Sequence, residues 1–479
     1  MGKIQQAKLL DRVEDPMCKV EESGRGDLTT SSCAHEDDKK TIPADTATEN
    51  TAPVFRQVEN VLRLAMGEGP REALKESDTG SLERVLGGSN SSSLFRKYSL
   101  GKIFSAAELC ISRGGEVLFH KALGSLRESD ISSPVLEKGK ANSRSDDKPL
   151  IKGLAYDLGS ITQVLATVTI FIKLMEQKLI SPDLKVSRIL QTFGSAGKEA
   201  MTLGHLLTHT SGLPAWMPVH RTMIKGQPNL NSLMTRRSSL HILFNELYRA
   251  RLENLPGKVY RPSDLGFLLL GQVLEVVTGT TFSKLYSQLV AKPLKLPSTG
   301  FIDLEKIRRK DLFLDTDMIV SSAYCPWRRR VIHGEVNDEI CWALGGVSSH
   351  SGLFGTVSDL HRFGELVLAG IHDLYKYLPA EIVRQSFGFD LTKKITEAPN
   401  PNLPFGWQLG RIPASMPDQA SRNIYYCLSK TGAGLWLDPV SGVVISLMTN
   451  AGQFDRETKK FIEFVPDFIS ILFSKETFS

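Results

Sequence analysis

The sequence predicts an α+β fold, in which an antiparallel sheet is flanked by helices and joined to a mainly helical lobe. Two apolar runs meet at Gly114-Gly115 in AAELCISRGGEVLFHKALG, which is typical of a β-hairpin. The chain from Ile161 to about Ala369 carries mostly helical patterns, and SKTGAGLWLDPVSGVVISLMTN then has the pattern of two strands joined by a proline-containing turn. Strands on both sides of a helical stretch favour one shared antiparallel sheet.

The elements follow one another along a single expected domain. Residues 1–51 are polar and charged and predict a disordered tail before a domain at 52–479. A polar stretch near 127–148 predicts a surface insertion after the hairpin. Residues 161–178 show a strong helical pattern, and the terminal KKFIEFVPDFISILF predicts a closing helix that is broken or begun near Pro466.

Composition excludes several classes of protein. The 479 residues are 41% hydrophobic, which is ample for a large core, and the net charge of +5 requires no nucleic-acid partner. We expect Arg328-Arg329-Arg330 to be a solvated loop rather than a phosphate site. The six cysteines have neither a CxxC pair nor metal-ligand spacing, so no metal or other cofactor is expected: Cys18, Cys33, Cys110, Cys325, Cys341 and Cys427.

The expected location is cytoplasmic. The N-terminal sequence has no apolar stretch of signal-peptide length before charged residues intervene. The longest apolar stretches, such as VLATVTIFIKLMEQK, are interrupted by charges and are too short to cross a bilayer. We therefore predict no integral membrane segment.

The segment YDLGSITQ contains the first candidate for chemistry, because it places Ser160 where a helix opens. A serine there has a plain structural role as a cap for the free backbone N–H groups. It also suits a nucleophile, because the same N–H groups and the helix dipole favour negative charge developing nearby. Both interpretations are open from this segment alone.

Five blocks in a fixed order resemble the family of class C β-lactamases, penicillin-binding proteins and related serine hydrolases. They are DLGSITQVLAT, MTLGHLLTHTSGLP, PGKVYRPSDLGFLLLGQVLEVVTG, HGEVNDEICWALGGVSSHSGLFGTVSDLHRF and GLWLDPVSGVVISLMTN. The resemblance implies a cleft between a sheet lobe and a helical lobe. It also implies attack by a serine on the carbonyl of a small-molecule or peptide substrate. A lysine one helical turn later, a tyrosine and a Lys/His-Thr-Gly strand assist that attack.

Residue by residue, the chain keeps only part of this machinery. Ser160 matches the nucleophile, but Gln163 stands at the lysine position, and an amide cannot act as a general base. It can still form a hydrogen bond to the serine or orient a water molecule. Pro262 replaces the tyrosine, and Tyr260, two residues earlier, is the candidate for its catalytic role, although Pro262 restricts the backbone between them. Asp264 matches the last position of that motif, with an alternative role as the N-cap of the following helix.

The third motif has two registers. Lys430-Thr431-Gly432 spells the family triplet and predicts substrate contacts, with an exposed hairpin lysine as the alternative. An ungapped alignment from Leu435-Trp436 instead places Cys427-Leu428-Ser429 at the triplet. His350 lies in a block that borders the family's cleft, so a substrate contact or a role as replacement base is expected. His205 and His209 have metal-compatible spacing, but we expect them to be structural.

Two functions follow. The first is a β-lactamase-related hydrolase that cleaves an amide, ester or lactam through an acyl-Ser160 intermediate. Its activity is weak because Gln163 and Pro262 replace the lysine and the tyrosine. The alternative is a catalytically inactive member that uses the cleft for binding or as a scaffold.

Overall fold

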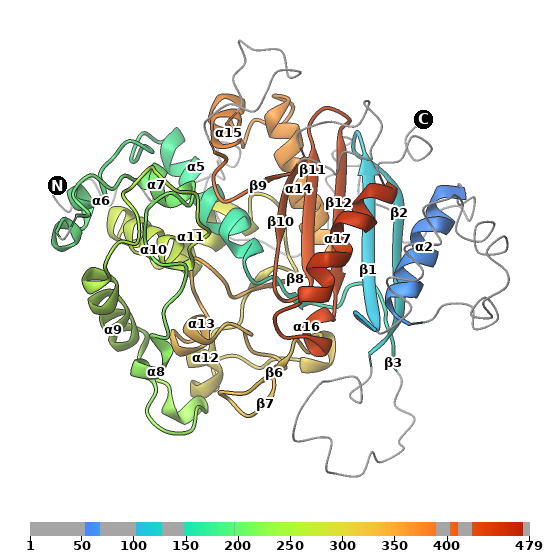
Figure 1. Cartoon of the computed structure of the whole chain (residues 1–479), viewed down its shortest axis with the longest axis horizontal. Helices are drawn as coiled ribbons and strands as arrows, with labels where there is room; N and C mark the ends of the chain where they lie inside the picture. The colour runs from blue at the N-terminus through green and yellow to red at the C-terminus, as the bar shows by residue number, and fades with distance from the viewer. Residues whose placement is uncertain are drawn as a thin grey trace, which may run out of the picture. The chain divides into compact units, whose positions relative to one another are not determined.

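The computed structural model describes residues 53–67, 102–126, 148–195, 197–388, 403–410 and 424–472. The predicted tail of residues 1–51 and residues 127–147 of the predicted insertion lie outside the described residues, so both stay predictions. The described chain combines antiparallel sheets with many helices and confirms the α+β class (Figure 1).

The largest sheet has seven strands in the order β3-β2-β1-β12-β11-β10-β9. The strands are β1 (Ala106–Arg113), β2 (Glu116–Leu126), β3 (Lys148–Pro149), β9 (Gln408–Gly410), β10 (Ile424–Leu428), β11 (Ala433–Asp438) and β12 (Val443–Thr449). The predicted hairpin is β1–β2, and β1 also pairs antiparallel with β12, with Cys110 opposite Ser446. Strands from both ends of the chain therefore share one sheet, as predicted.

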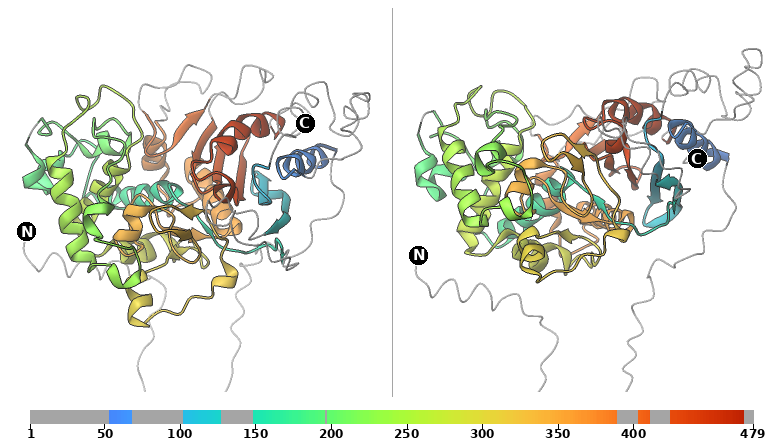
Figure 2. Two further views of the ribbon diagram at one scale, coloured as in Figure 1. Left: turned by 60° about the horizontal axis from the view of Figure 1, so that its bottom comes forward. Right: turned by 90° about the horizontal axis from the view of Figure 1, so that it is seen from below.

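Helices cover both faces of this sheet because its central strands are apolar on both sides. Leu109 and Ile111 of β1 pack in one cluster with α2 (Pro53–Ala65) and α17 (Lys459–Leu472). These two helices contact each other and lie next to each other in both views of Figure 2. α14 (Val357–Ile371) packs against β1, β11 and β12 in the second cluster, where alternate residues of β1 point.

The closing helix corrects one prediction. α17 runs unbroken through Pro466, so the expected break or start at that residue is wrong. A proline inside a helix removes one backbone hydrogen bond, whose acceptor here would be the carbonyl of Ile462. The Ile462 side chain is exposed, so water can reach that part of the helix, and the buried Phe461, Phe464 and Phe468 hold the helix on the sheet.

Helices dominate the chain between the two groups of strands. They are α5 (Thr169–Glu176), α6 (Val186–Ile189), α7 (Leu203–Leu207), α8 (His220–Met223), α9 (Arg236–Arg249), α10 (Asp264–Thr278), α11 (Phe282–Tyr286), α12 (Leu304–Arg309), α13 (Glu339–Ala343) and α15 (Ala380–Ser386), with α16 (Ala451–Phe454) after β12. Short 3₁₀ helices lie at η5 (Gln191–Phe193), η6 (Leu230–Ser232) and η8 (Thr316–Met318), and π-helical segments at η4 (Gln163–Val168) and η7 (Ser287–Ala291). Two small sheets complete the fold, β4 (Tyr156–Asp157), β8 (Leu353–Gly355) and β5 (Gly300–Phe301) in one and β6 (Tyr324–Cys325) with β7 (Arg330–Val331) in the other.

The helix predicted at 161–178 is present and starts directly after β4. It begins at Ile161, widens to π geometry in η4 and continues as α5 to Glu176. The Thr169 hydroxyl donates to the Val164 carbonyl at 3.0 Å, five residues back, which fits the wider turn. Nearly the whole helix is buried, so its first turn is a rigid position for a functional side chain.

Among the described residues, no single helix is long and apolar enough to cross a bilayer. One bent pair, Asp264–Thr278 with Phe282–Ala291, meets the test on length and composition alone. The expected cytoplasmic location stays a prediction.

Candidate active site

The candidate nucleophile Ser160 lies at the junction between β4 and the buried helix. Gly159 precedes it with φ +48°, a left-handed conformation that turns the chain from strand into helix. The Ser160 side chain is partly exposed, and its hydroxyl donates to the carbonyl of Leu428 at the end of β10, at 2.9 Å. The serine therefore lies between the helical part of the chain and the large sheet.

The Asp157 side chain stabilises the turn at Gly159 and Ser160. One carboxylate oxygen accepts the N–H of Gly159 at 2.9 Å, and the other accepts the N–H of Asn337 at 2.7 Å. The side chain is buried, and this burial raises the pKa of Asp157 to about 6 despite the two hydrogen bonds. Asp157 therefore connects the nucleophile turn to the loop before α13.

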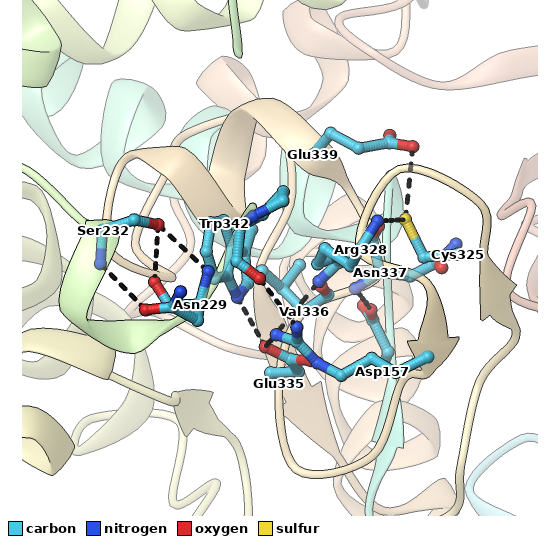
Figure 3. A network of polar contacts seen from close by, with 12 residues as sticks. Asp157, Asn229, Ser232, Cys325, Arg328, Glu335, Val336, Asn337, Glu339 and Trp342 are labelled. Carbon is cyan, nitrogen blue, oxygen red and sulfur yellow. Dashed lines mark hydrogen bonds and ion pairs between the residues drawn. The ribbon is translucent and has the colours of Figure 1, made fainter. Parts of the chain in front are cut away.

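A buried arginine supports the same loop. Arg328 is 1% exposed and donates to the carbonyls of Val336, at 2.7 Å, and Asn337 (Figure 3). Its guanidinium also lies 3.9 Å from the carboxylate of Glu335. The prediction that the whole Arg328-Arg329-Arg330 run is a solvated loop is therefore wrong for Arg328. These carbonyl and carboxylate partners offset part of the cost of its burial, while its Nε has no hydrogen-bond partner in the described part of the chain.

Gln163, at the lysine position, pairs with Asp264. Its side-chain N–H donates to a carboxylate oxygen of Asp264 at 3.0 Å, although the two residues are 101 positions apart. Gln163 is buried, whereas Asp264 is partly exposed. Burial raises the pKa of Asp264 and Asp338 adds to the rise, while His350, Lys430 and the bond from Gln163 oppose it.

Ser263, not Asp264, caps α10. The Ser263 hydroxyl accepts the backbone N–H of Gly266 at 3.4 Å. The backbone N–H of Ser263 donates to Nδ1 of His209 at 3.1 Å. The alternative interpretation of Asp264 as the N-cap is therefore wrong, because the cap falls one residue earlier. Burial lowers the pKa of His209 to about 4, which keeps its ring a neutral acceptor.

Tyr260 is 43% exposed and packs edge-on against the ring of His209. Burial of its hydroxyl end raises the pKa of Tyr260, and Tyr426 and Cys427 on β10 add to this rise. The tyrosine therefore lies near the strand that contacts Ser160, two residues before the exposed Pro262.

The two alternative alignments of the third motif, Cys427-Leu428-Ser429 and Lys430-Thr431-Gly432, lie at different places in the structure. Cys427 and Leu428 end β10, and the Cys427 thiol lies 3.8 Å from the carbonyl oxygen of Ser160. A side chain at Gly159 would overlap the Ser429 hydroxyl. Cys427-Leu428-Ser429 is thus the stretch beside the candidate nucleophile.

Lys430-Thr431-Gly432 forms the turn between β10 and β11. The Lys430 side chain is 70% exposed and pairs with Glu457 at 3.0 Å. Thr431 is buried, and its hydroxyl lies 2.8 Å from that of Ser429, while the Gly432 N–H donates to the Ser429 carbonyl. In the described part of the chain, the backbone N–H groups of Ser160 and Lys430 donate to no protein acceptor.

His350 is buried with both ring nitrogens occupied. Nδ1 lies 2.7 Å from the Ser348 hydroxyl and Nε2 lies 3.0 Å from the carboxylate of Asp338. Burial alone lowers the pKa of His350, but the Asp338 carboxylate, with help from Asp264, raises it above its ordinary value. The imidazole is thus a partner of Asp338 rather than an open proton acceptor.

Sequence reasoning missed Asp157, Asn337, Asp338 and Arg328. Asp157 stands three residues before Ser160 in DLGS, so its nearness to the nucleophile was visible in the sequence. Asn337 and Asp338 lie in the loop before α13, and Arg328 reaches that loop from the turn between β6 and β7. The loop is linked to the nucleophile turn by the contact between Asn337 and Asp157, 180 residues apart, which no local pattern shows.

Comparison with known proteins gives consistent matches. A family model described as Beta-lactamase matches residues 93–463. The "Putative D-alanyl-D-alanine carboxypeptidase" of Escherichia coli (strain K12) is 25% identical in an alignment of 366 residues that covers 72% of this chain and 78% of that protein. The N-acetylmuramyl-L-alanine amidase of Bacillus subtilis (strain 168) is 24% identical in an alignment of 363 residues that covers 72% of this chain and 77% of that protein.

Solved structures share the fold. EstCE1, a hydrolase with promiscuous acyltransferase activity, superposes with a TM-score of 0.57 and 20% identity, covering 87% of this chain and 98% of that one. A class C β-lactamase gives a TM-score of 0.54 and 14% identity, covering 88% of this chain and 98% of that one.

Proposed function

The chain belongs to the β-lactamase family, and from that premise we propose that it is a weak serine hydrolase acting through an acyl-Ser160 intermediate. The substrate is a small molecule or peptide with an amide, ester or lactam carbonyl. The observation that carries this proposal is the placement of a partly exposed Ser160 at the first turn of a buried helix, 2.9 Å from the end of β10.

The surroundings of Ser160 suit an acyl transfer. Attack of the Ser160 oxygen on a carbonyl leaves a negative charge on the carbonyl oxygen. Backbone N–H groups without a protein acceptor, as at Ser160 and Lys430, are the donors that stabilise such a charge. The names of the two relatives, a carboxypeptidase and an amidase, favour an amide bond in a peptide as the first substrate class to test.

We expect the hydrolase activity to be weak because the family's motif positions no longer provide a group that accepts the proton of Ser160. General-base assistance is worth roughly 10² to 10⁴-fold, and the amide of Gln163 cannot supply it. The family's tyrosine position is Pro262, which also has no titratable group. We therefore expect slow turnover compared with members that keep the lysine and the tyrosine.

A non-catalytic binding or scaffold protein is the second candidate. It is favoured by the hydroxyl of Ser160, which donates to the backbone carbonyl of Leu428 rather than to a base. In this case the cleft would bind a small molecule or peptide without forming a covalent bond.

Active-site labelling distinguishes the two functions. Purified protein is incubated with a fluorophosphonate probe and, separately, with a fluorescent penicillin, with Ser160→Ala as the control. Labelling that disappears in Ser160→Ala supports the hydrolase. Absence of labelling in a protein with an intact cooperative unfolding transition supports the binding protein.

A further inference from the structure

A proton acceptor for Ser160 has to come from residues other than the family's lysine and tyrosine. Four nearby groups do not qualify. Both nitrogens of His350 are occupied, and both carboxylate oxygens of Asp157 already accept backbone N–H groups. The pKa of Tyr260 is raised by burial, so its hydroxyl keeps its proton, and Lys430 is exposed and paired with Glu457.

The Cys427 thiol, 3.8 Å from the Ser160 carbonyl oxygen, does not qualify either, because burial raises its pKa to about 12 and it keeps its proton. Asp264 is the candidate that remains among these described neighbours of the nucleophile. Its carboxylate accepts the side-chain N–H of Gln163 at 3.0 Å, and Gln163 follows Ser160 by three residues, so both lie on one face of the helix. Ser263 is the N-cap of α10, so the Asp264 carboxylate does not serve as the cap. Asp264 is also partly exposed, unlike Asp157.

The setting of Asp264 suits a group that takes up and releases a proton. It occupies the first turn of the 15-residue α10, where the helix dipole stabilises a carboxylate. Burial and Asp338 raise its pKa, and His350, Lys430 and Gln163 limit that rise. A partly exposed carboxylate with a raised pKa, held through Gln163 beside the candidate nucleophile, has the properties of a general base.

We propose that Asp264 is the proton acceptor for Ser160, in place of the family's lysine, and that Gln163 is a positioning residue that holds its carboxylate. This inference rests on the proposed hydrolase function. The Ser160 O–H bond breaks, its proton passes to Asp264, and the serine oxygen bonds to the substrate carbonyl carbon. Asp264 then returns the proton to the leaving amine or alkoxide as the scissile bond breaks. In deacylation it takes a proton from water and gives one back to the Ser160 oxygen.

The test is the rate at which an uncharged fluorophosphonate ester labels Ser160 between pH 4 and pH 9. In the wild-type protein the rate should rise with pH through the pKa of Asp264 and then level off. Asp264→Asn keeps the acceptor for Gln163 but removes the base. Its plateau rate should be lower at least tenfold, a part of the roughly 10² to 10⁴-fold that full general-base assistance supplies, and the acid limb of the profile should disappear. Asp264→Glu retains a carboxylate and should keep the acid limb at a reduced rate.

Asp359→Asn is the matched control. Asp359 also lies in the first turn of a 15-residue helix, α14, and binds Ser298 and Thr299 instead of the site. It should label like the wild type. An Asp264→Asn protein with the wild-type rate and pH profile would overturn the assignment of Asp264 alone. A folded wild-type protein that never labels at Ser160 would overturn the hydrolase function and this inference with it.

Discussion

Restoring the family's lysine alone should not restore activity. In Gln163→Lys the introduced ammonium would take the place of the amide that now lies 3.0 Å from the Asp264 carboxylate. Two unit charges at that separation attract by about 5 kcal/mol at an effective dielectric constant of about 20, which is an upper bound for a partly exposed pair. That attraction raises the pKa of the introduced lysine.

A lysine whose pKa is raised stays protonated at neutral pH and cannot accept the proton of Ser160. The same ion pair makes Asp264 a poorer base. We therefore expect Gln163→Lys to label with fluorophosphonate at least tenfold more slowly than the wild type. The double variant Gln163→Lys/Asp264→Asn, in which the carboxylate is absent, should label at least tenfold faster than the single variant. A single variant that labels faster than the wild type would refute this reasoning.

Three further predictions concern the neighbours of Ser160. Burial raises the pKa of Asp157 from 3.8 to about 6, so the native state binds more protons than the unfolded state between these values. About 2 kcal/mol of stability is therefore lost as pH rises from 4 to 7. In urea unfolding, Asp157→Asn should not show this loss. A difference in unfolding free energy between wild type and variant that is the same at pH 4 and pH 7 would contradict the raised pKa of Asp157. Gly159→Ala should lower the melting temperature, because the left-handed backbone costs about 1–2 kcal/mol and the methyl group meets Ser429. Ser429→Gly in the same chain should recover part of the loss, and no recovery would show that the overlap is unimportant. Lys430→Ala should change the unfolding free energy by less than about 1 kcal/mol, since its ion pair with Glu457 is exposed. A tenfold loss of turnover on a substrate with a carboxylate would instead assign Lys430 to substrate binding.

The fold was predictable because its signals are local. Alternating apolar residues around Gly114-Gly115 give the hairpin, and the 3.6-residue period after Ile161 gives the buried helix. Pro466 was misleading because a helix held by tertiary packing tolerates one missing hydrogen bond on its exposed side.

The site was only partly predictable because its contacts join distant parts of the chain. The sequence identifies Ser160, Gln163 and Asp264 as motif positions. It does not show that Gln163 bonds Asp264 or that the Ser160 hydroxyl reaches Leu428, 268 residues away. Arg328 appeared as one of three adjacent surface arginines, and only the folded loop brings its guanidinium to the buried carbonyls of Val336 and Asn337 (Figure 3).

The central claim is that Ser160 is a nucleophile, and an acyl-enzyme is its most direct test. Purified wild-type protein and Ser160→Ala are mixed with an excess of p-nitrophenyl acetate, quenched with acid within seconds and measured by intact-mass spectrometry and peptide mapping. We predict a mass increase of one acetyl group on the peptide that contains Ser160 in the wild type alone. An equal adduct in Ser160→Ala, or an adduct on another residue, would contradict it.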